Sequence, residues 1–270
     1  MTKVLLILIC LVGLIGRAST AEFNPHEGPR PIVVLMESNP WLTVIGSDTP
    51  TFVLYEDGQV VFLKETSDEA HYLTKLLTPA ELRDVKVKLK AAMPTQPVEK
   101  SYDVAPNTSD QATTHFYLDV DGKRLVTSIR AMDSEDESGI PSKFRRDPAT
   151  RMPPKEMRVL RTMIRSLELQ DARAWVPSYV EVMVWPYEYA PEESIHWPKV
   201  WPGLDSPNTR KHGKLHSIFV PGKEETAILA FLKTRKQKGA VEIDGKKWAM
   251  ALREAFPSEP VWFALFRGGD

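Results

Sequence analysis

Three Asp-Gly pairs, each between segments rich in β-branched and aromatic residues, constrain the fold of this chain more than any other feature. The segments are TFVLYEDGQVVFL (51–63), HFYLDVDGKRLVTSI (115–129) and AVEIDGKKWAMAL (240–252). Asp and Gly tolerate the positive φ angles that a tight turn between two strands requires. The sequence therefore predicts antiparallel sheets built from three Asp-Gly hairpins.

Three further segments have apolar residues at helical spacing, which predicts about three amphipathic helices packed on these sheets. They cover residues 77–94, 153–169 and 223–239. In the first, Thr78 is the predicted N-cap, Pro79 is the first helical residue and Glu81 completes a capping box. In the third, Gly239 is the predicted C-cap. The predicted fold class is therefore α+β.

The first 21 residues have the pattern of a secretory signal peptide. Lys3 precedes an apolar run over residues 4–15, and the small residues Ser19 and Ala21 precede a predicted cleavage site. The run is shorter than the roughly 20 residues that span a bilayer, and no later segment is more apolar, so no membrane span is predicted. We expect an exported mature chain, periplasmic or secreted, that begins near Glu22.

Cys10 is the only cysteine, and it lies within this apolar run. Its neighbour Ile9 is not the small residue that precedes a lipid-modified cysteine, so no lipid anchor is predicted at Cys10. Without residues 1–21 the chain has no thiol, which excludes disulfides, cysteine-ligated zinc and cysteine nucleophiles. Cleavage leaves 33 of the 35 basic residues against 36 acidic ones. This balance gives no electrostatic attraction to nucleic acid.

The polar stretch over residues 131–154 is acidic, then basic, and has almost no large apolar residue. This composition cannot anchor a core, so it predicts a surface loop or a linker. We divide the mature chain into an N-terminal α+β domain (22–131), a polar loop or linker (132–153) and a C-terminal α+β region (154–270). The two regions can also form one continuous domain, and an alternative boundary lies near Trp175.

Motifs of known reactions are absent from the sequence: no glycine-rich phosphate loop and no G-x-S-x-G is present. His212 and His216 have the spacing of a helical metal pair, but Gly213 disfavours the helix. In a strand the two would lie about 13 Å apart, too far for one metal. The acidic run 133–139 does not match an EF-hand loop. We therefore predict no metal and no cofactor, and assign no catalytic residue.

The segment WPYEYAPEESIHWPKVWPGL (185–204) contains three Trp-Pro pairs. Proline fixes its own φ and favours an extended preceding residue, so this loop is expected to be stiff. Rigid aromatic rings suit a sugar ring or a protein partner, and they equally suit holding a loop on a sheet. The candidate ligand- or partner-binding residues are Trp185, Tyr187, Tyr189, His196, Trp197 and Trp201.

The strand before this loop alternates, so Tyr179, Glu181, Met183 and Trp185 share one face while three valines occupy the other. We expect the valine face in the core and the Trp-Pro loop over the opposite face.

Export, the missing thiol and the missing motifs together favour a soluble, non-catalytic binding protein. Its ligand would be a protein partner or a cell-envelope component such as a glycan, and inhibitor or immunity-like roles fit the same features. The alternative is an exported hydrolase with dispersed carboxylate and histidine acid–base residues, including the region of His212 and His216.

Overall fold

The computed structural model describes residues 22–267 except residues 43, 45, 66–69, 135–148, 168 and 170. The predicted signal peptide, its cleavage site at Ala21, Cys10 and most of the predicted linker lie outside the described residues. The strands are β1 (Pro31–Ser38), β2 (Pro50–Tyr55), β3 (Gln59–Glu65), β4 (Ala70–Leu76), β5 (Ser101–Asp103), β6 (Thr113–Val120), β7 (Lys123–Arg130), β8 (Arg173–Ala174), β9 (Tyr179–Pro186), β10 (Glu192–His196), β11 (Thr209–His212), β12 (Leu215–Pro221), β13 (Gly239–Ile243) and β14 (Lys246–Ala255). The helices are α1 (Pro79–Ala92), α3 (Glu156–Arg165), α4 (Glu225–Lys233) and α5 (Pro260–Arg267), with short 3-10 turns η1 (Met132–Ser134) and η2 (Gly222–Glu224).

The strands form two mixed sheets. Sheet A has the order β5-β7-β6-β1-β2-β3-β4-β8, and sheet B has the order β10-β13-β14-β9-β12-β11. The α+β class is confirmed, but the expectation of purely antiparallel sheets is wrong, because β5 runs parallel to β7 and β10 runs parallel to β13. Parallel neighbours are joined through long connections, which a pattern of local turns does not reveal.

Two Asp-Gly pairs form two-residue turns between antiparallel strands. Val120 lies opposite Lys123 across Asp121-Gly122, and Ile243 lies opposite Lys246 across Asp244-Gly245. All four turn residues have positive φ, the geometry that matches the twist of paired strands.

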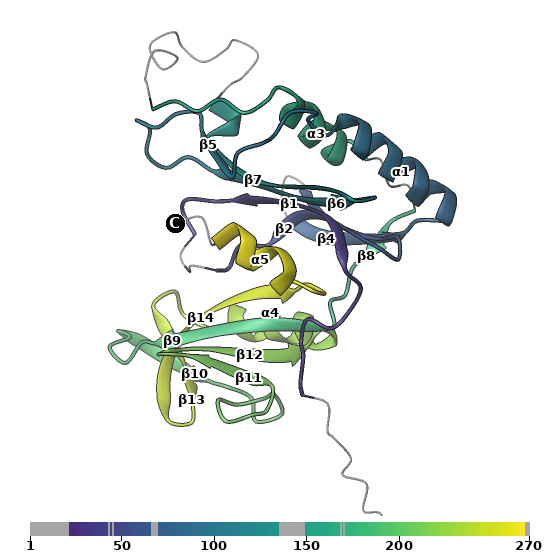
Figure 1. Cartoon of the computed structure of the whole chain (residues 1–270). Coiled ribbons are helices and arrows are strands. Elements are labelled where there is room, and N and C mark those ends of the chain that lie inside the picture. Colours follow the sequence, from purple (N-terminus) through teal and green to yellow (C-terminus); the bar gives the residue numbers. More distant parts are fainter. Residues whose placement is uncertain are drawn as a thin grey trace, which may run out of the picture.

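The layers alternate between helices and sheets (Figure 1). On the outer face of sheet A, Leu35, Phe116 and their neighbours form a core with α1 and α3. On its inner face, Val34, Tyr117 and their neighbours pack against Phe256 and Trp262, which precede and begin α5. Sheet B turns its valine face to α4. The order is therefore α1 and α3, sheet A, α5, sheet B, α4.

Helix α1 begins as the sequence predicts, which confirms its capping box. The Glu81 backbone N–H donates to Thr78 Oγ1 at 3.3 Å, and the Thr78 N–H donates to Glu81 Oε2 at 2.7 Å. Hydrogen bonds from Thr78, with a further one from Lys75, lower the pKa of Glu81 to about 2. The start of α1 after β4 is thus set locally.

Gly239 is not the C-cap of α4, contrary to the prediction. The helix ends at Lys233, and Gly239 begins β13. A Cβ atom on Gly239 would lie 2.6 Å from the Glu193 carbonyl oxygen. Glycine is therefore required because β10 approaches the backbone closely at this point.

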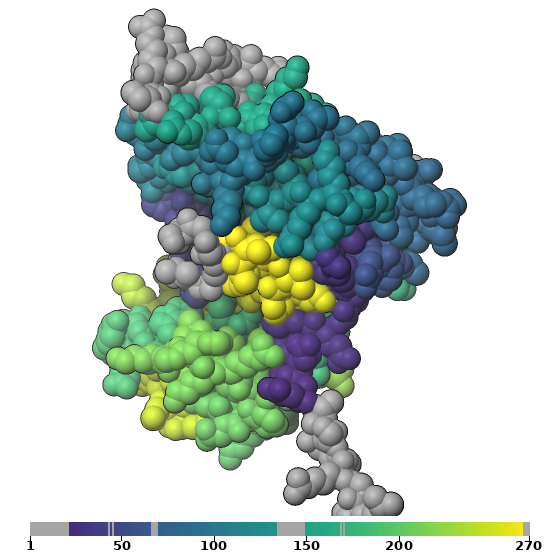
Figure 2. Space-filling view, in the orientation of Figure 1, coloured from purple at the N-terminus to yellow at the C-terminus, as the bar shows by residue number. Residues whose placement is uncertain are grey.

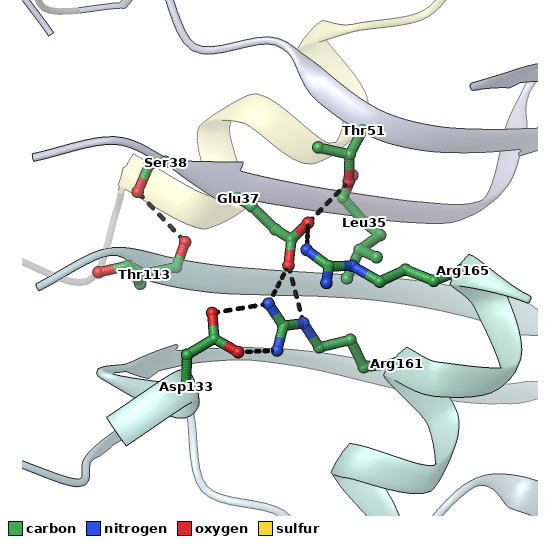
Figure 3. A network of polar contacts seen from close by, with 8 residues as sticks. All are labelled: Leu35, Glu37, Ser38, Thr51, Thr113, Asp133, Arg161 and Arg165. Atoms are coloured by element: carbon green, nitrogen blue, oxygen red, sulfur yellow. Dashed lines mark hydrogen bonds and ion pairs between the residues drawn. The ribbon is translucent and has the colours of Figure 1, made fainter. Parts of the chain in front are cut away.

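An ion-pair network holds α3 on sheet A (Figure 3). The Glu37 carboxylate, near the end of β1, accepts from Arg161 Nε at 2.7 Å and from Arg165 Nη2 at 2.5 Å. Arg161 also pairs with Asp133, and this hydrogen bond lowers the pKa of Asp133. Glu37 and Arg161 are almost buried, so each depends on the other for compensation of its charge.

Aromatic side chains join the two halves of the molecule. Phe256, between β14 and α5, contacts Tyr72 of β4 and Trp175 with ring centroids 5.2 and 4.8 Å apart. Residues 22–30, which precede β1, contact sheet B. The Phe23 ring packs edge-on against the Tyr179 ring of β9, with the centroids 5.2 Å apart. Strand β8 pairs with β4 in sheet A and β9 belongs to sheet B, so residues 175–178 connect the two halves.

Replacing Glu37 with Gln should lower the free energy of unfolding by about 2–4 kcal/mol, because Arg165 and Arg161 lose their shared buried carboxylate. Urea unfolding measures the change. Glu193→Gln is the control, since Glu193 pairs with Lys236 at the exposed surface and should contribute less than about 1 kcal/mol. Equal effects of the two substitutions would contradict the role of the network.

Candidate functional site

Trp197 and Trp201 lie in the core of sheet B. They are 8% and 9% exposed and belong to the cluster on the valine face. Their rings pack on each other at 4.9 Å and on Phe231 of α4 at 5.8 and 5.6 Å. The predicted position of the Trp-Pro loop, over the Tyr179–Trp185 face, is therefore wrong. The two tryptophans of the loop share the valine face with Ile228 and Phe231 of α4.

The other predicted binding residues do not gather into one site. Tyr189 is 83% exposed and meets Tyr187 edge-on at 5.4 Å. His196 is exposed near Glu242, with its Nδ1 atom 3.8 Å from the carboxylate. Trp185 alternates with the valines and so lies on the opposite face of β9 from the buried tryptophans. Tyr187 and Tyr189 therefore form one pair, and the structure shows no contact of this pair with His196 or Trp185 among the described residues.

His212 and His216 lie on opposite faces of sheet B. In the hairpin of β11 and β12, Lys211 is opposite His216 and His212 is opposite Leu215. His216 is buried and packs edge-on against Trp248 at 5.2 Å. Burial lowers the pKa of His216. The two imidazoles therefore cannot share a metal ion or act together as acid and base.

Residues 260–266 of helix α5 are all apolar, although some of them are exposed. Its sequence is PVWFALFR. Trp262 is fully buried against sheet A, whereas Val261, Ala264 and Leu265 are exposed. Figure 2 shows α5 at the surface, between the half built on sheet A and the half built on sheet B. Exposed apolar side chains grouped between two domains are typical of binding sites.

The hollow between α5 and sheet B, here called the Arg253 hollow, has a volume of about 590 Å³. Arg253 is almost fully buried and donates to Glu181 Oε2 at 2.8 Å through Nε. Its Nη2 atom also pairs with Glu259 at 2.7 Å. His26 Nδ1 lies 3.0 Å from the Phe256 carbonyl oxygen, which only accepts, so Nδ1 carries the proton. The buried Arg253 of this hollow is thus compensated by two carboxylates, whereas Arg210, which also lines it, contacts the Phe23 carbonyl oxygen and the Phe219 ring.

A second hollow, here called the His115 groove, lies between the last turn of α5 and strands β5, β7 and β6 of sheet A. Its volume is about 750 Å³, within the usual range for small-molecule sites. The polar lining residues are Lys100, Ser101, Thr113, His115, Arg124 and Ser128. The apolar lining residues are Val126, Ala264, Leu265 and Phe266. Ala264 also lines the Arg253 hollow, so α5 separates the two spaces.

Two serines hold His115 at the floor of the groove. The Ser128 Oγ atom lies 2.8 Å from His115 Nδ1, and the Ser38 Oγ atom lies 3.4 Å from Nε2. The Phe266 ring packs on the imidazole at 4.9 Å. Burial lowers the pKa of His115 to about 4, so the ring is neutral at pH 7.

The rim of the groove is cationic. Lys100 and Arg124 are exposed there, and none of the described residues that line the groove is acidic. Asp119 lies opposite Arg124 across the β6–β7 ladder, but its carboxylate pairs with Arg30. Among the described residues, no carboxylate forms an ion pair with Lys100 or Arg124. The groove therefore combines an apolar wall, a neutral polar floor and two cations without a carboxylate partner among the described residues.

No protein family, curated protein or solved structure matches this chain. The described helices include none that is both long and apolar enough to cross a bilayer. Within the described ranges, no group of three His, Cys, Asp or Glu side chains is arranged to hold a metal ion.

Sequence reasoning missed both hollows because they form between distant segments. His115 and Ser128 lie in the predicted hairpin of residues 115–129, where their shared face follows from alternation. The apolar segment over 260–266 has no polar face, so it did not show helical periodicity. Its position against Thr113, His115 and Ser128 depends on how the two sheets pack.

Trp201→Ala should lower the free energy of unfolding by about 3–5 kcal/mol, because it leaves a cavity beside Trp197 and Phe231. Tyr189→Ala removes an exposed ring and should change it by less than about 0.5 kcal/mol. Urea unfolding of both variants tests these positions. A Trp201→Ala midpoint equal to that of Tyr189→Ala would place Trp201 outside the core.

Lowering the pH from 6.5 to 4 should destabilise the protein through His115, because only the unfolded chain binds a proton on this residue in that window. The loss is expected to be about 1–3 kcal/mol. Urea unfolding at several pH values measures this loss in the unmodified protein and in His115→Asn. In the variant, this part of the pH dependence should disappear. Identical pH profiles for the two proteins would contradict a neutral buried imidazole.

Proposed function

We propose that this chain is an exported, non-catalytic binding protein that holds a cell-envelope ligand between its two sheets, against α5. The observation that carries the proposal is the exposure of apolar α5 side chains inside a groove of ligand size. A helix that is apolar all round is normally covered on all sides. In this protein a ligand would supply the missing cover over Leu265 and its neighbours.

The His115 groove supports this proposal better than the Arg253 hollow does. In the Arg253 hollow, Glu181 and Glu259 already compensate Arg253, and a ligand would compete with these ion pairs. In the His115 groove, Lys100 and Arg124 have no such partner among the described residues. An anionic group of a ligand therefore does not compete with a carboxylate there. The Arg124 guanidinium lies 5.8 Å from the centroid of the Tyr117 ring and has only this cation–π contact among the described residues.

Hydrolysis is the second candidate function, and one contact favours it. Ser128 Oγ lies 2.8 Å from His115 Nδ1, as in a nucleophile and its base. The other ring nitrogen meets Ser38 instead of a carboxylate, and the lowered pKa weakens the imidazole as a base. These features favour binding over catalysis. A bound ester recovered as its acid and alcohol would support the hydrolase.

Leu265→Asn should weaken binding of the uncharged apolar dye Nile red by about tenfold, because it removes apolar contact area from the groove wall. Leu265 is 40% exposed, so the fold should tolerate the change. The dye is titrated by fluorescence into the mature chain (22–270), and the circular dichroism spectrum verifies folding.

Val87→Asn is the matched control, since Val87 is an exposed apolar residue on α1, on the other side of sheet A. It should leave dye binding unchanged. If neither the unmodified protein nor the variants bound the dye, α5 would not be part of a binding site. If both substitutions reduced binding equally, the dye would be reporting general surface hydrophobicity.

A further inference from the structure

We propose that the His115 groove binds a single-chain anionic amphiphile, with its carboxylate or phosphate head at Lys100 and Arg124 and its chain along α5. This inference rests on the proposed function and specifies the chemical class of the ligand. It follows from the arrangement of charge, hydroxyl groups and apolar surface around one groove.

The charge of the groove selects an anion. Lys100 and Arg124 both line the groove, and its lining contains no acidic residue among those that the structure describes. The nearest carboxylate across the β6–β7 ladder, that of Asp119, is compensated by Arg30. A carboxylate or phosphate would form charge-assisted hydrogen bonds with the two cations, and a cationic head would be repelled.

The floor provides polar groups without a competing charge. His115 stays neutral above a pH of about 4, and its two ring nitrogens are held by Ser128 and Ser38. Thr113 and Ser101 add hydroxyl groups to the lining. Hydroxyl groups of this kind donate hydrogen bonds to the oxygen atoms of an anionic head.

The opposite wall is apolar and fits a hydrocarbon chain. Leu265 and Phe266 of α5 and Val126 of β7 form the apolar part of the lining. Because Leu265 remains 40% exposed, the groove is open along one side. A single flexible chain can lie in such an open groove, and each methylene group that it buries contributes about 0.8 kcal/mol.

The test compares four probes of equal chain length by isothermal titration calorimetry at pH 7.5: decanoate, decyl phosphate, decan-1-ol and decyltrimethylammonium. We expect both anions to bind at least about tenfold more tightly than the alcohol, and the cation to bind more weakly than the alcohol. The ratio of decanoate to decyl phosphate affinity distinguishes a carboxylate ligand from a phosphate ligand. Added salt should weaken binding of the anions only.

The double variant Lys100→Gln/Arg124→Gln should lose most of the preference for anions and keep its affinity for decan-1-ol. Arg83→Gln/Lys88→Gln is the matched control, because it removes one arginine and one lysine from the exposed surface of α1. This control should retain the full preference.

The outcomes separate the two proposals. Equal binding of all four probes would overturn the anionic ligand and leave the proposed binding function intact. Failure of all four probes to bind would overturn both proposals. A preference for anions that survives in Lys100→Gln/Arg124→Gln would overturn the assignment of the head group to these two residues.

Discussion

A helix of eight residues cannot cover the inner face of an eight-stranded sheet, and the organisation of the molecule depends on this mismatch. Helix α5 is about 12 Å long, whereas sheet A is roughly 34 Å wide. Trp262 and Phe256 bury the middle of that face and join it to sheet B. The sheet edge formed by β5, β7 and β6 extends past the helix. A hollow beside α5 is thus a geometric result of packing a short helix between two sheets.

Buried charged side chains of this protein are paired, whereas the exposed cations of the groove form no ion pair with a described residue. Glu37 and Arg161 are almost buried and fully paired, as are Arg253 and its two carboxylates. Burying a charge without a partner costs several kcal/mol, so these networks are needed once the elements pack together. Lys100 and Arg124 remain in contact with water and have no such requirement. Ion pairing within the fold therefore does not explain their arrangement around an apolar wall.

Local signals in the sequence predict the elements well and their assembly poorly. The capping box at Thr78 and Glu81 is confirmed because both partners lie within one helical turn. Parallel pairing of β10 with β13 is invisible locally, and so is the need for glycine at Gly239, which faces the Glu193 carbonyl. The Trp-Pro loop illustrates the same limit: its stiffness follows from proline, but the face that it covers depends on α4. None of the six candidate residues in that loop lines the His115 groove.

The hydrogen bond between His26 and the Phe256 carbonyl joins residues that are 230 positions apart. Sheet A needs only the chain up to Ala174, so its strands can pair long before α5 has been synthesised. Until then Val34, Val53 and Tyr117 line a bare apolar face. Phe256 and Trp262, which cover this face in the folded protein, follow all the strands of sheet A in the sequence. A chain synthesised from its N-terminus therefore exposes this apolar face to water until that segment has emerged.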